Sequence, residues 1–191
     1  MTNILQRTFA PALLALLALA LPAWPAPAKP APLPANSLYH LTLPLTDQQG
    51  RATKLEDWRG KPVMITMFYS SCQFVCPRIV EALKNTEEKL ATKLPVLMVS
   101  LDPARDDVAT LKAMVDERHI DAKRWTLART DARNVRKLAA ALGIQYRELP
   151  SGEFNHSTVI ILLDAEGRIT GKTSMLGDAD PAFVALAKKV K

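Results

Sequence analysis

The feature that most constrains the fold of this chain is an alternation of short apolar segments with segments of helical periodicity. Residues 63–68 (VMITMF) and 96–101 (VLMVSL) are apolar runs with the length of buried strands. Residues 77–93 follow the first run and repeat apolar side chains at helical spacing. Because strands that alternate with helices build a sheet covered by helices, these segments predict an α/β domain.

The other segments extend this prediction to the element order β-β-β-α-β-α-β-α-β-β-α. Residues 41–43 and 51–53 flank the turn sequence Asp47-Gln48-Gln49-Gly50 and predict an N-terminal hairpin. Further helices are predicted from Asp106 or Asp107 to 115, at 135–142 and at 181–190, and further strands at 125–127, 158–163 and 168–170. The closing strand-turn-strand-helix is typical of thioredoxin-like folds. We therefore expect a central mixed sheet flanked by helices.

The first 36 residues have a different composition from the rest of the chain. Arg7 precedes an apolar segment at 9–21 that is rich in Leu and Ala, and small residues follow it. This pattern predicts a secretory signal peptide over residues 1–28, with an uncleaved anchor as the alternative. Residues 29–36 are rich in Pro and Ala and predict an extended tether. The folded domain is then expected at 37–191, in an exported protein.

Cys72 and Cys76 are the only cysteines, and their C-x-x-x-C spacing is one residue longer than that of thiol oxidoreductases. At this spacing on a helix two side chains share a face, about 5–6 Å apart. Such a pair can hold a soft metal ion, and it can close a disulfide where the backbone is not rigidly helical. The pair follows the strand at 63–68 and begins a helix, where sites form in α/β sheets and where thiolates are stabilised.

A structural disulfide is the simplest use of two cysteines in an exported domain, because thiols oxidise outside the cytosol. This domain, however, is long enough to bury a core without a covalent bridge. A bridge between Cys72 and Cys76 would also close a short loop and remove little entropy from the unfolded chain. The sequence therefore favours a chemical use of the two thiols, either metal binding or thiol-disulfide exchange.

Three histidines could add a ligand. His40 lies near the tether and His119 ends a predicted helix, so both are expected to be solvated or packing residues. His156 follows the polar segment 150–153 and opens the strand at 158–163. In thioredoxin-like folds the start of that strand faces the cysteine loop, and oxidoreductases carry a cis-proline there. Since this chain has no proline between Phe154 and Asp180, His156 is the functional candidate.

Two thiolates and one imidazole are ligands that suit copper or zinc and do not suit calcium or magnesium. Structural zinc usually takes four ligands, whereas three satisfy Cu(I), so copper is favoured. The formal net charge is +6, but no Lys/Arg cluster is interleaved with aromatic residues, and nucleic-acid binding therefore has little support. No G-x-G-x-x-G, P-loop or G-x-S-x-G motif is present.

These residues together resemble a known family. The segments that carry the resemblance are Phe68-x3-Cys72-x3-Cys76-Pro77, Ser100-Leu101-Asp102-Pro103-x-Arg105-Asp106, His156-Ser157-Thr158 with Leu163-Asp164-x2-Gly167, and Leu55-x4-Gly60-Lys61-Pro62. In this order they look like the Sco/SenC family, over about residues 38–190. The resemblance implies a thioredoxin-like protein of the bacterial periplasm, soluble or tethered to the inner membrane, or of the mitochondrial intermembrane space.

The resemblance also implies a function. Sco proteins bind Cu(I) or Cu(II) and assist assembly of the CuA centre of cytochrome c oxidase, as copper donors, as thiol reductants of the target, or both. It implies that Cys72, Cys76 and His156 are the copper ligands and that Asp102 is an acidic neighbour of the site. The implied partners are the apo CuA subunit or another periplasmic cuproprotein, other copper chaperones and thiol reductases.

Two positions depart from the family pattern. Gln73 follows the first cysteine where many members have proline, and Asn155 precedes the histidine where many have aspartate. Asn155 cannot raise the basicity of the imidazole as a carboxylate would, which leaves copper affinity and oxidation state open. The main prediction is a copper metallochaperone. The alternatives are a thiol-disulfide oxidoreductase and a binding domain with a structural disulfide.

Overall fold

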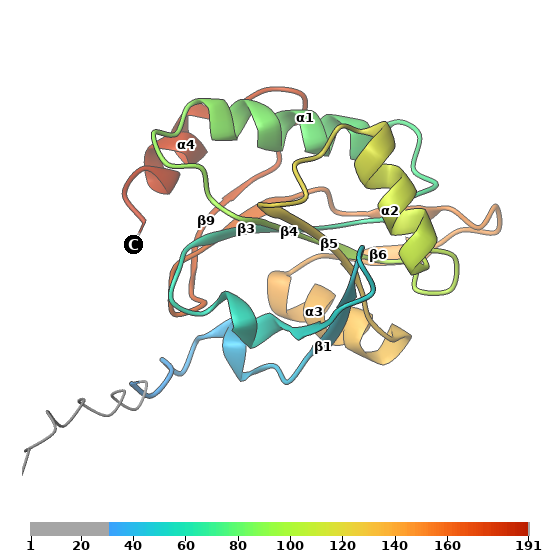
Figure 1. Cartoon of the computed structure of the whole chain (residues 1–191), viewed down its shortest axis with the longest axis horizontal. Coiled ribbons are helices and arrows are strands. Elements are labelled where there is room, and N and C mark those ends of the chain that lie inside the picture. Colours follow the sequence, from blue (N-terminus) through green and yellow to red (C-terminus); the bar gives the residue numbers. More distant parts are fainter. Residues whose placement is uncertain (1–30, 191) are drawn as a thin grey trace, which may run out of the picture. The chain divides into compact units, whose positions relative to one another are not determined.

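The computed structural model describes residues 31–190, and Figure 1 shows a central sheet covered by helices on both faces. The strands in this part of the chain form a seven-stranded sheet in the order β2-β1-β5-β4-β3-β8-β9 and a separate two-stranded sheet, β6-β7. The predicted signal peptide, residues 1–28, lies outside the described residues, as does the start of the predicted tether. Within the described part of the chain, no helix is long and apolar enough to cross a membrane.

The strands are β1 (Pro44–Asp47), β2 (Ala52–Lys54), β3 (Val63–Phe68), β4 (Val96–Ser100), β5 (Trp125–Arg129), β6 (Tyr146–Glu148), β7 (Phe154–His156), β8 (Ile160–Leu163) and β9 (Ile169–Thr173). The helices are α1 (Val75–Glu88), α2 (Val108–Glu117), α3 (Ala132–Leu142) and α4 (Pro181–Ala187), with 3-10 turns η1 (Leu38–His40) and η2 (Leu55–Trp58). Strands β3, β4 and β5 are parallel, whereas β1, β2, β8 and β9 pair antiparallel with their neighbours. The predicted mixed α/β sheet is therefore confirmed.

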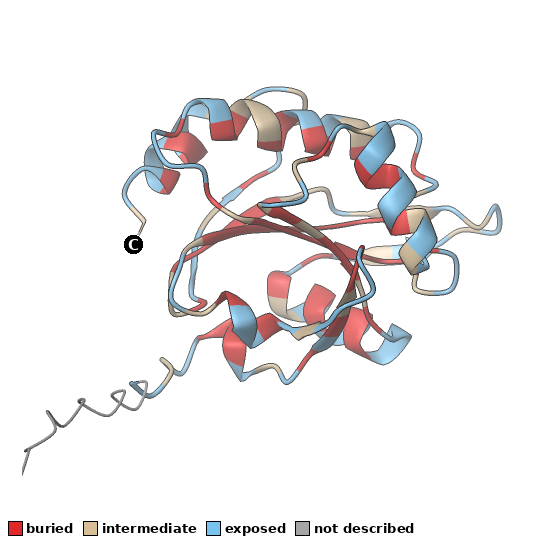
Figure 2. Cartoon of the chain, in the orientation of Figure 1, coloured by how far each residue is buried: buried red, intermediate tan, exposed pale blue. Residues whose placement is uncertain are grey.

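Strand β3 is buried along its whole length, because helices cover both faces of the sheet (Figure 2). Successive side chains of a strand point to opposite faces. Met64 and Phe68 accordingly join the core beneath α1, α2 and α4, while Ile65 and Met67 join the core formed with α3 and the 3-10 turns. Residues buried on both faces read as a continuous apolar run, which is why this strand was predictable.

The N-terminal hairpin is confirmed, with its first strand three residues later than predicted. Residues 38–40 form η1, and β1 begins at Pro44. The turn closes as expected, because the amide of Gly50 donates to the carbonyl of Asp47 at 2.9 Å and Gly50 has a φ of 78°. Helix α1 begins at Val75, two residues before the predicted start, and so includes Cys76 in its first turn.

The β6-β7 ribbon was not predicted. The polar segment 150–153, predicted only as a loop, lies in the turn between these two strands. Strand β6 reads Tyr-Arg-Glu and β7 reads Phe-Asn-His, and neither strand is fully buried. Without an apolar run, a half-exposed ribbon gives no strand signal. His156 consequently belongs to β7 and not to the start of the following strand, which begins at Ile160.

Candidate metal centre

The two segments that carry the cysteines and the predicted acidic neighbour leave the sheet side by side. Phe68 and Ser100 are register partners at the carboxyl ends of β3 and β4. The backbone amide of Leu101 donates to the carbonyl of Phe68 at 2.6 Å, which joins the two segments just beyond the strands. This edge is where α/β sheets form their sites. Figure 1 shows the β6-β7 ribbon projecting at the same end of the molecule.

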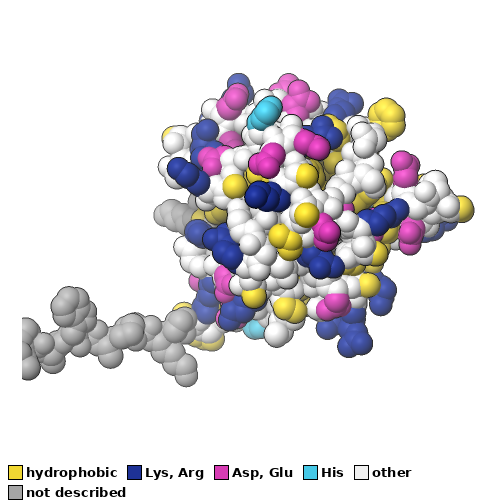
Figure 3. Space-filling model, turned by 45° about the vertical axis from the view of Figure 1, so that its right-hand side comes forward, with side chains coloured by type: hydrophobic (Ala, Val, Ile, Leu, Met, Phe, Trp, Pro, Cys, Tyr) yellow, Lys and Arg dark blue, Asp and Glu magenta, His cyan; other side chains and the backbone are white. Residues whose placement is uncertain are grey.

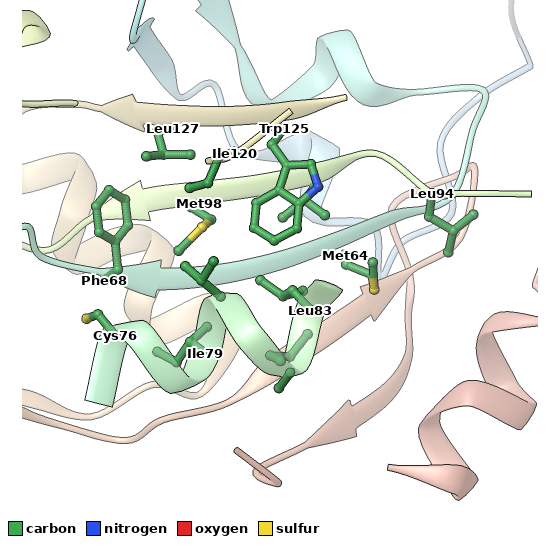
Figure 4. Close-up of a cluster of buried hydrophobic side chains, with 14 of the residues drawn as sticks. Met64, Phe68, Cys76, Ile79, Leu83, Leu94, Met98, Ile120, Trp125 and Leu127 are labelled. Atoms are coloured by element: carbon green, nitrogen blue, oxygen red, sulfur yellow. The ribbon is translucent and has the colours of Figure 1, made fainter. Parts of the chain in front are cut away.

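Cys72 and Cys76 lie together as free, buried thiols with exposed fractions of 6% and 2%. The backbone amide of Cys76 donates to the sulfur of Cys72 across 3.3 Å. Cys76 sits in the first turn of α1, and Figure 4 shows it at the end of that helix, near Phe68 at the edge of the apolar cluster. The two sulfurs thus lie together after β3, with Cys76 inside the first turn of α1 and Cys72 just before it.

The two thiols differ in proton affinity. The pKa of Cys72 falls to about 5, because hydrogen bonds to its sulfur from the Cys76 thiol and from the amides of Cys76 and Val75, together with the nearby Tyr69 hydroxyl, outweigh the effect of burial. The pKa of Cys76 is raised, because it donates to the Cys72 sulfur and because it is buried. At neutral pH the pair therefore consists of one thiolate and one thiol.

His156 packs against Tyr69, the residue that follows β3 and precedes the cysteine loop. The two rings meet edge-on with centroids 5.8 Å apart, and the Tyr69 hydroxyl donates to the carbonyl of Phe154 at 3.3 Å. Nδ1 of His156 lies 3.2 Å from the carbonyl of Ser157. Since a carbonyl can only accept, Nδ1 carries the proton and Nε2 keeps its lone pair. Burial lowers the pKa of His156, so the ring is neutral at pH 7 and can act as a ligand.

The structure brings the two cysteines together but does not close a three-ligand cluster around them. Among the described residues, no three His, Cys, Asp or Glu side chains are grouped so that they could hold a metal ion. Nε2 of His40, outside this region, lies 2.9 Å from the carbonyl of Pro34. The cysteine pair with a nearby neutral imidazole still has the donor chemistry that suits copper.

The two predicted outer residues have different surroundings. Asp102 is buried and forms an ion pair with Arg105. The guanidinium of Arg105 also donates to the carbonyl of Gly152 and lies 5.7 Å from the centroid of the Phe154 ring. Asp102 thus reaches the β6-β7 ribbon through Arg105. Asn155 is exposed and alternates with His156 along β7, so its side chain points to the opposite face of the strand.

Two further residues have roles that their sequence context did not predict. Asp106, one of the two residues predicted as candidates for the helix cap, is fully buried, and its carboxylate accepts from the Ser70 amide at 3.1 Å and from the Ser100 hydroxyl at 2.5 Å. Asp107 caps α2 instead, accepting from the amide of Thr110. Asp106 therefore ties the cysteine loop to the end of β4. Tyr69, the other missed residue, could have been suspected only from its place directly between β3 and the cysteines.

Comparison with known proteins assigns the chain to a family. The family described as SCO1/SenC matches residues 35–191. The chain belongs to the SCO1/SenC family. The mitochondrial SCO2 homolog of Bos taurus is 27% identical over 146 residues, which cover 71% of this chain and 54% of the relative. The chain thus spans about half the length of the curated relatives that it matches.

Two solved Sco structures share the fold. ScoI of Bradyrhizobium japonicum, solved with copper bound, is 25% identical, with a TM-score of 0.60 over 75% of this chain and 95% of that one. ScoI of Arabidopsis thaliana, also solved with copper bound, has a TM-score of 0.69 at 18% identity, over 77% of this chain and 96% of that one. These likenesses confirm the predicted thioredoxin-like fold and the predicted family.

Proposed function

We propose that this SCO1/SenC domain binds one copper ion through Cys72, Cys76 and His156 and passes it to an apo cuproprotein outside the cytosol. The observation that carries the proposal is the contact between Cys72 and Cys76 at the start of α1, where the backbone amide of Cys76 donates to the Cys72 sulfur at 3.3 Å. The CuA subunit of cytochrome c oxidase is the first target to test, and another periplasmic cuproprotein is the second.

The charges of the donor groups support copper as the cargo. Cys72 can bind the ion as it stands, because its low pKa makes it a thiolate at neutral pH. Cys76 must give up its proton, and a metal ion drives that loss by binding the thiolate. His156 adds a neutral nitrogen. Two thiolates and one imidazole give a net charge of about −1 with Cu(I) and about zero with Cu(II), so a buried site is left with little unpaired charge.

Because the described structure does not group His156 with the two cysteines, the ribbon must move for His156 to join them. The structure offers a route for such a movement, since β6 and β7 pair with each other and with no strand of the main sheet. The ribbon is held at its base, where the amide of Ser157 donates to the carbonyl of Gln145 at 2.8 Å. We infer that the ribbon acts as a small mobile arm that brings Nε2 of His156 to a copper ion already held by the two sulfurs.

The proposed site requires an exported protein with its cysteines reduced. The apolar leader at 1–28 and the tether at 29–36 support a domain held at, or released from, the outer face of the inner membrane. Thiols tend to oxidise in such a compartment, so reduction precedes metal loading. The same thiolate also suits the alternative role, reduction of a target disulfide, and the experiment below separates the two.

The test follows metal and thiols together. The reduced domain is loaded with Cu(I) and mixed with the apo CuA domain of the same organism, and copper and free thiols are measured in both proteins. We expect one copper per chain, and copper transfer with no change in total thiol. Thiols lost from this domain and gained by an oxidised target, without copper transfer, would instead establish the reductase.

Substitutions test the ligand set. Cys72→Ser and Cys76→Ser should each abolish tight binding. His156→Ala should weaken it by about tenfold or more, since even an outer partner of a ligand is worth about 10–100-fold. His40→Ala is the matched control, because His40 binds a backbone carbonyl away from the cysteines. Unchanged copper stoichiometry, affinity and spectrum in His156→Ala would disprove the three-ligand proposal.

A further inference from the structure

Phe74 is an aromatic side chain that the fold leaves almost fully in water. Its exposed fraction is 84%, whereas the other exposed large hydrophobic residues among those described, Ile169, Met175 and Leu186, range from 36% to 44%. It lies in the loop between Cys72 and Cys76, both of which are buried. The most exposed large apolar side chain in the described part of the chain therefore lies in the loop between the two proposed copper ligands.

Nothing in the folding of this loop calls for a phenylalanine at position 74. The residue is the N-cap of α1, and its side chain makes no capping hydrogen bond. Ser, Thr, Asp or Asn at that position would satisfy a free helix amide, and Phe cannot do so. The side chain is also not among the apolar residues that pack against either core. Phe74 thus neither caps α1 nor adds a buried side chain to either core.

We propose, on the basis of the copper-transfer function above, that Phe74 is the anchor by which this domain docks onto its copper-exchanging protein partner. The partner is expected to present an apolar pocket beside its own cysteine or methionine sulfur ligands. A large aromatic side chain that enters such a pocket is the commonest kind of interface hot spot. Docking would bury most of the apolar surface that Phe74 now exposes.

The burial of the sulfurs argues for a protein partner at this position. Cys72 and Cys76 expose only 6% and 2% of their surface, so a ligand that replaces them must come in at the loop itself. In the exchange the copper bonds to the two thiolates and to His156 break as copper–sulfur bonds to the partner form, and Cys76 takes up a proton from the partner's thiol or from water. Copper remains Cu(I), and no electron is transferred. Phe74 lies two residues from each cysteine, so a partner whose ligand approaches through this loop can contact it.

The surroundings of Phe74 fit a single anchor better than a broad apolar patch. Its loop neighbours Ser71 and Gln73 are exposed and polar. In Figure 3, where the right-hand side of Figure 1 comes forward, hydrophobic side chains lie scattered among charged side chains of both signs. An apolar centre within a polar rim is the usual make-up of interfaces that form and separate. Such a contact allows the partner to leave once copper has moved.

The test compares Phe74→Ala and Phe74→Leu with the wild-type domain, each loaded with Cu(I). The measurements are the affinity for the apo CuA domain of the same organism and the second-order rate of copper transfer to it. We expect Phe74→Ala to lower both by about 30-fold, the loss of one interface hot spot, and Phe74→Leu to restore part of each. Copper affinity, measured by competition with a Cu(I) chelator, should stay within about threefold in both variants.

Leu186→Ala is the matched control, since Leu186 is an exposed apolar residue of α4, which lies at the other end of the sheet from the cysteine loop in Figure 1. It should transfer copper at the wild-type rate. If Phe74→Ala transfers copper as fast as the wild-type domain, the docking proposal is wrong while the proposed copper-transfer function stands. A wild-type domain that neither binds nor transfers copper overturns the proposed function and the anchor with it.

Two other binding partners of Phe74, a second copy of this chain and a membrane, are tested with the same variants. If sedimentation shows wild-type dimers that Phe74→Ala dissociates, the occupant is a second copy of this chain and the proposal is wrong. If the wild-type domain binds phosphatidylglycerol vesicles and Phe74→Ala does not, the occupant is a membrane and the proposal is again wrong. The docking anchor is supported if the wild-type domain is a monomer, does not bind the vesicles and needs Phe74 for fast copper transfer.

Discussion

The backbone amide of Cys76 donates a hydrogen bond to the sulfur of Cys72 across 3.3 Å, and the Cys76 thiol donates a second bond to the same sulfur. One residue thus stabilises the anionic form of the other. The C-x-x-x-C spacing makes this possible, because Cys76 begins the helix while Cys72 lies just before it and faces the free amides of the first turn. The pair is asymmetric before any metal binds.

The first prediction follows from the low pKa of Cys72, about 5 in the folded chain against an ordinary value of 9.0. The rate of iodoacetamide alkylation of the reduced domain should reach half its maximum near pH 5 and be flat above about pH 7, because the thiolate is the nucleophile. In urea the half-maximum should move close to 9. A rate that still rises between pH 8 and 9 in the folded domain would contradict this assignment.

The second prediction concerns the source of that shift. The largest contribution to the low pKa of Cys72 is the hydrogen bond from the Cys76 thiol. Cys76→Ala removes this donor but keeps the backbone amides, so the pKa of Cys72 should rise and still remain below 9.0. The same alkylation profile measures it. An unchanged profile would mean that the helix amides alone stabilise the thiolate.

The third prediction concerns Asp106. Asp106→Ala leaves the Ser70 amide and the Ser70 and Ser100 hydroxyls without their acceptor in a buried place, which should lower the free energy of unfolding by about 3 kcal/mol. Asp107→Ala removes only a helix cap and should cost about 1 kcal/mol. Urea unfolding of the two variants gives the comparison. Equal losses would show that Asp106 does not hold the cysteine loop.

Sequence analysis predicted the parts of the fold that are buried on both faces. The strand at 63–68 and the strand at 96–101 read as apolar runs because each contributes side chains to the two cores. The cysteine pair was located correctly for the same reason, since it directly follows the first of these strands. A strand that is buried on both faces consists of consecutive apolar residues, and such a run can be recognised locally in the sequence.

The β6-β7 ribbon and the contacts around His156 have no such apolar run in the sequence. The ribbon is short, polar and half exposed, so its pairing depends on contacts with residues distant in sequence, such as Arg105. The Asp106 carboxylate was indistinguishable from a helix cap until its hydrogen bond to Ser70 was seen. Contacts of this kind follow from the tertiary structure and not from local periodicity.

The fourth prediction concerns Asn155, the position where many family members carry aspartate. Its exposed side chain lies on the face of β7 opposite His156, whose Nδ1 is already bonded to the carbonyl of Ser157. Asn155→Asp should therefore change copper affinity by less than about threefold, far less than the loss of a ligand. Competition with a copper chelator measures it. A tenfold gain would instead show that the new carboxylate turns toward the imidazole.

The last prediction concerns Arg105, which joins the segment after β4 to the ribbon that carries His156. Arg105→Ala loses the ion pair with Asp102, the bond to the Gly152 carbonyl and the contact with the Phe154 ring. The amides of β6 and β7 should exchange hydrogen about tenfold faster, the result of about 1.4 kcal/mol of lost local stability. Arg147→Ala, an exposed residue of β6, is the control. If the two variants have the same exchange rates, Arg105 does not hold the ribbon.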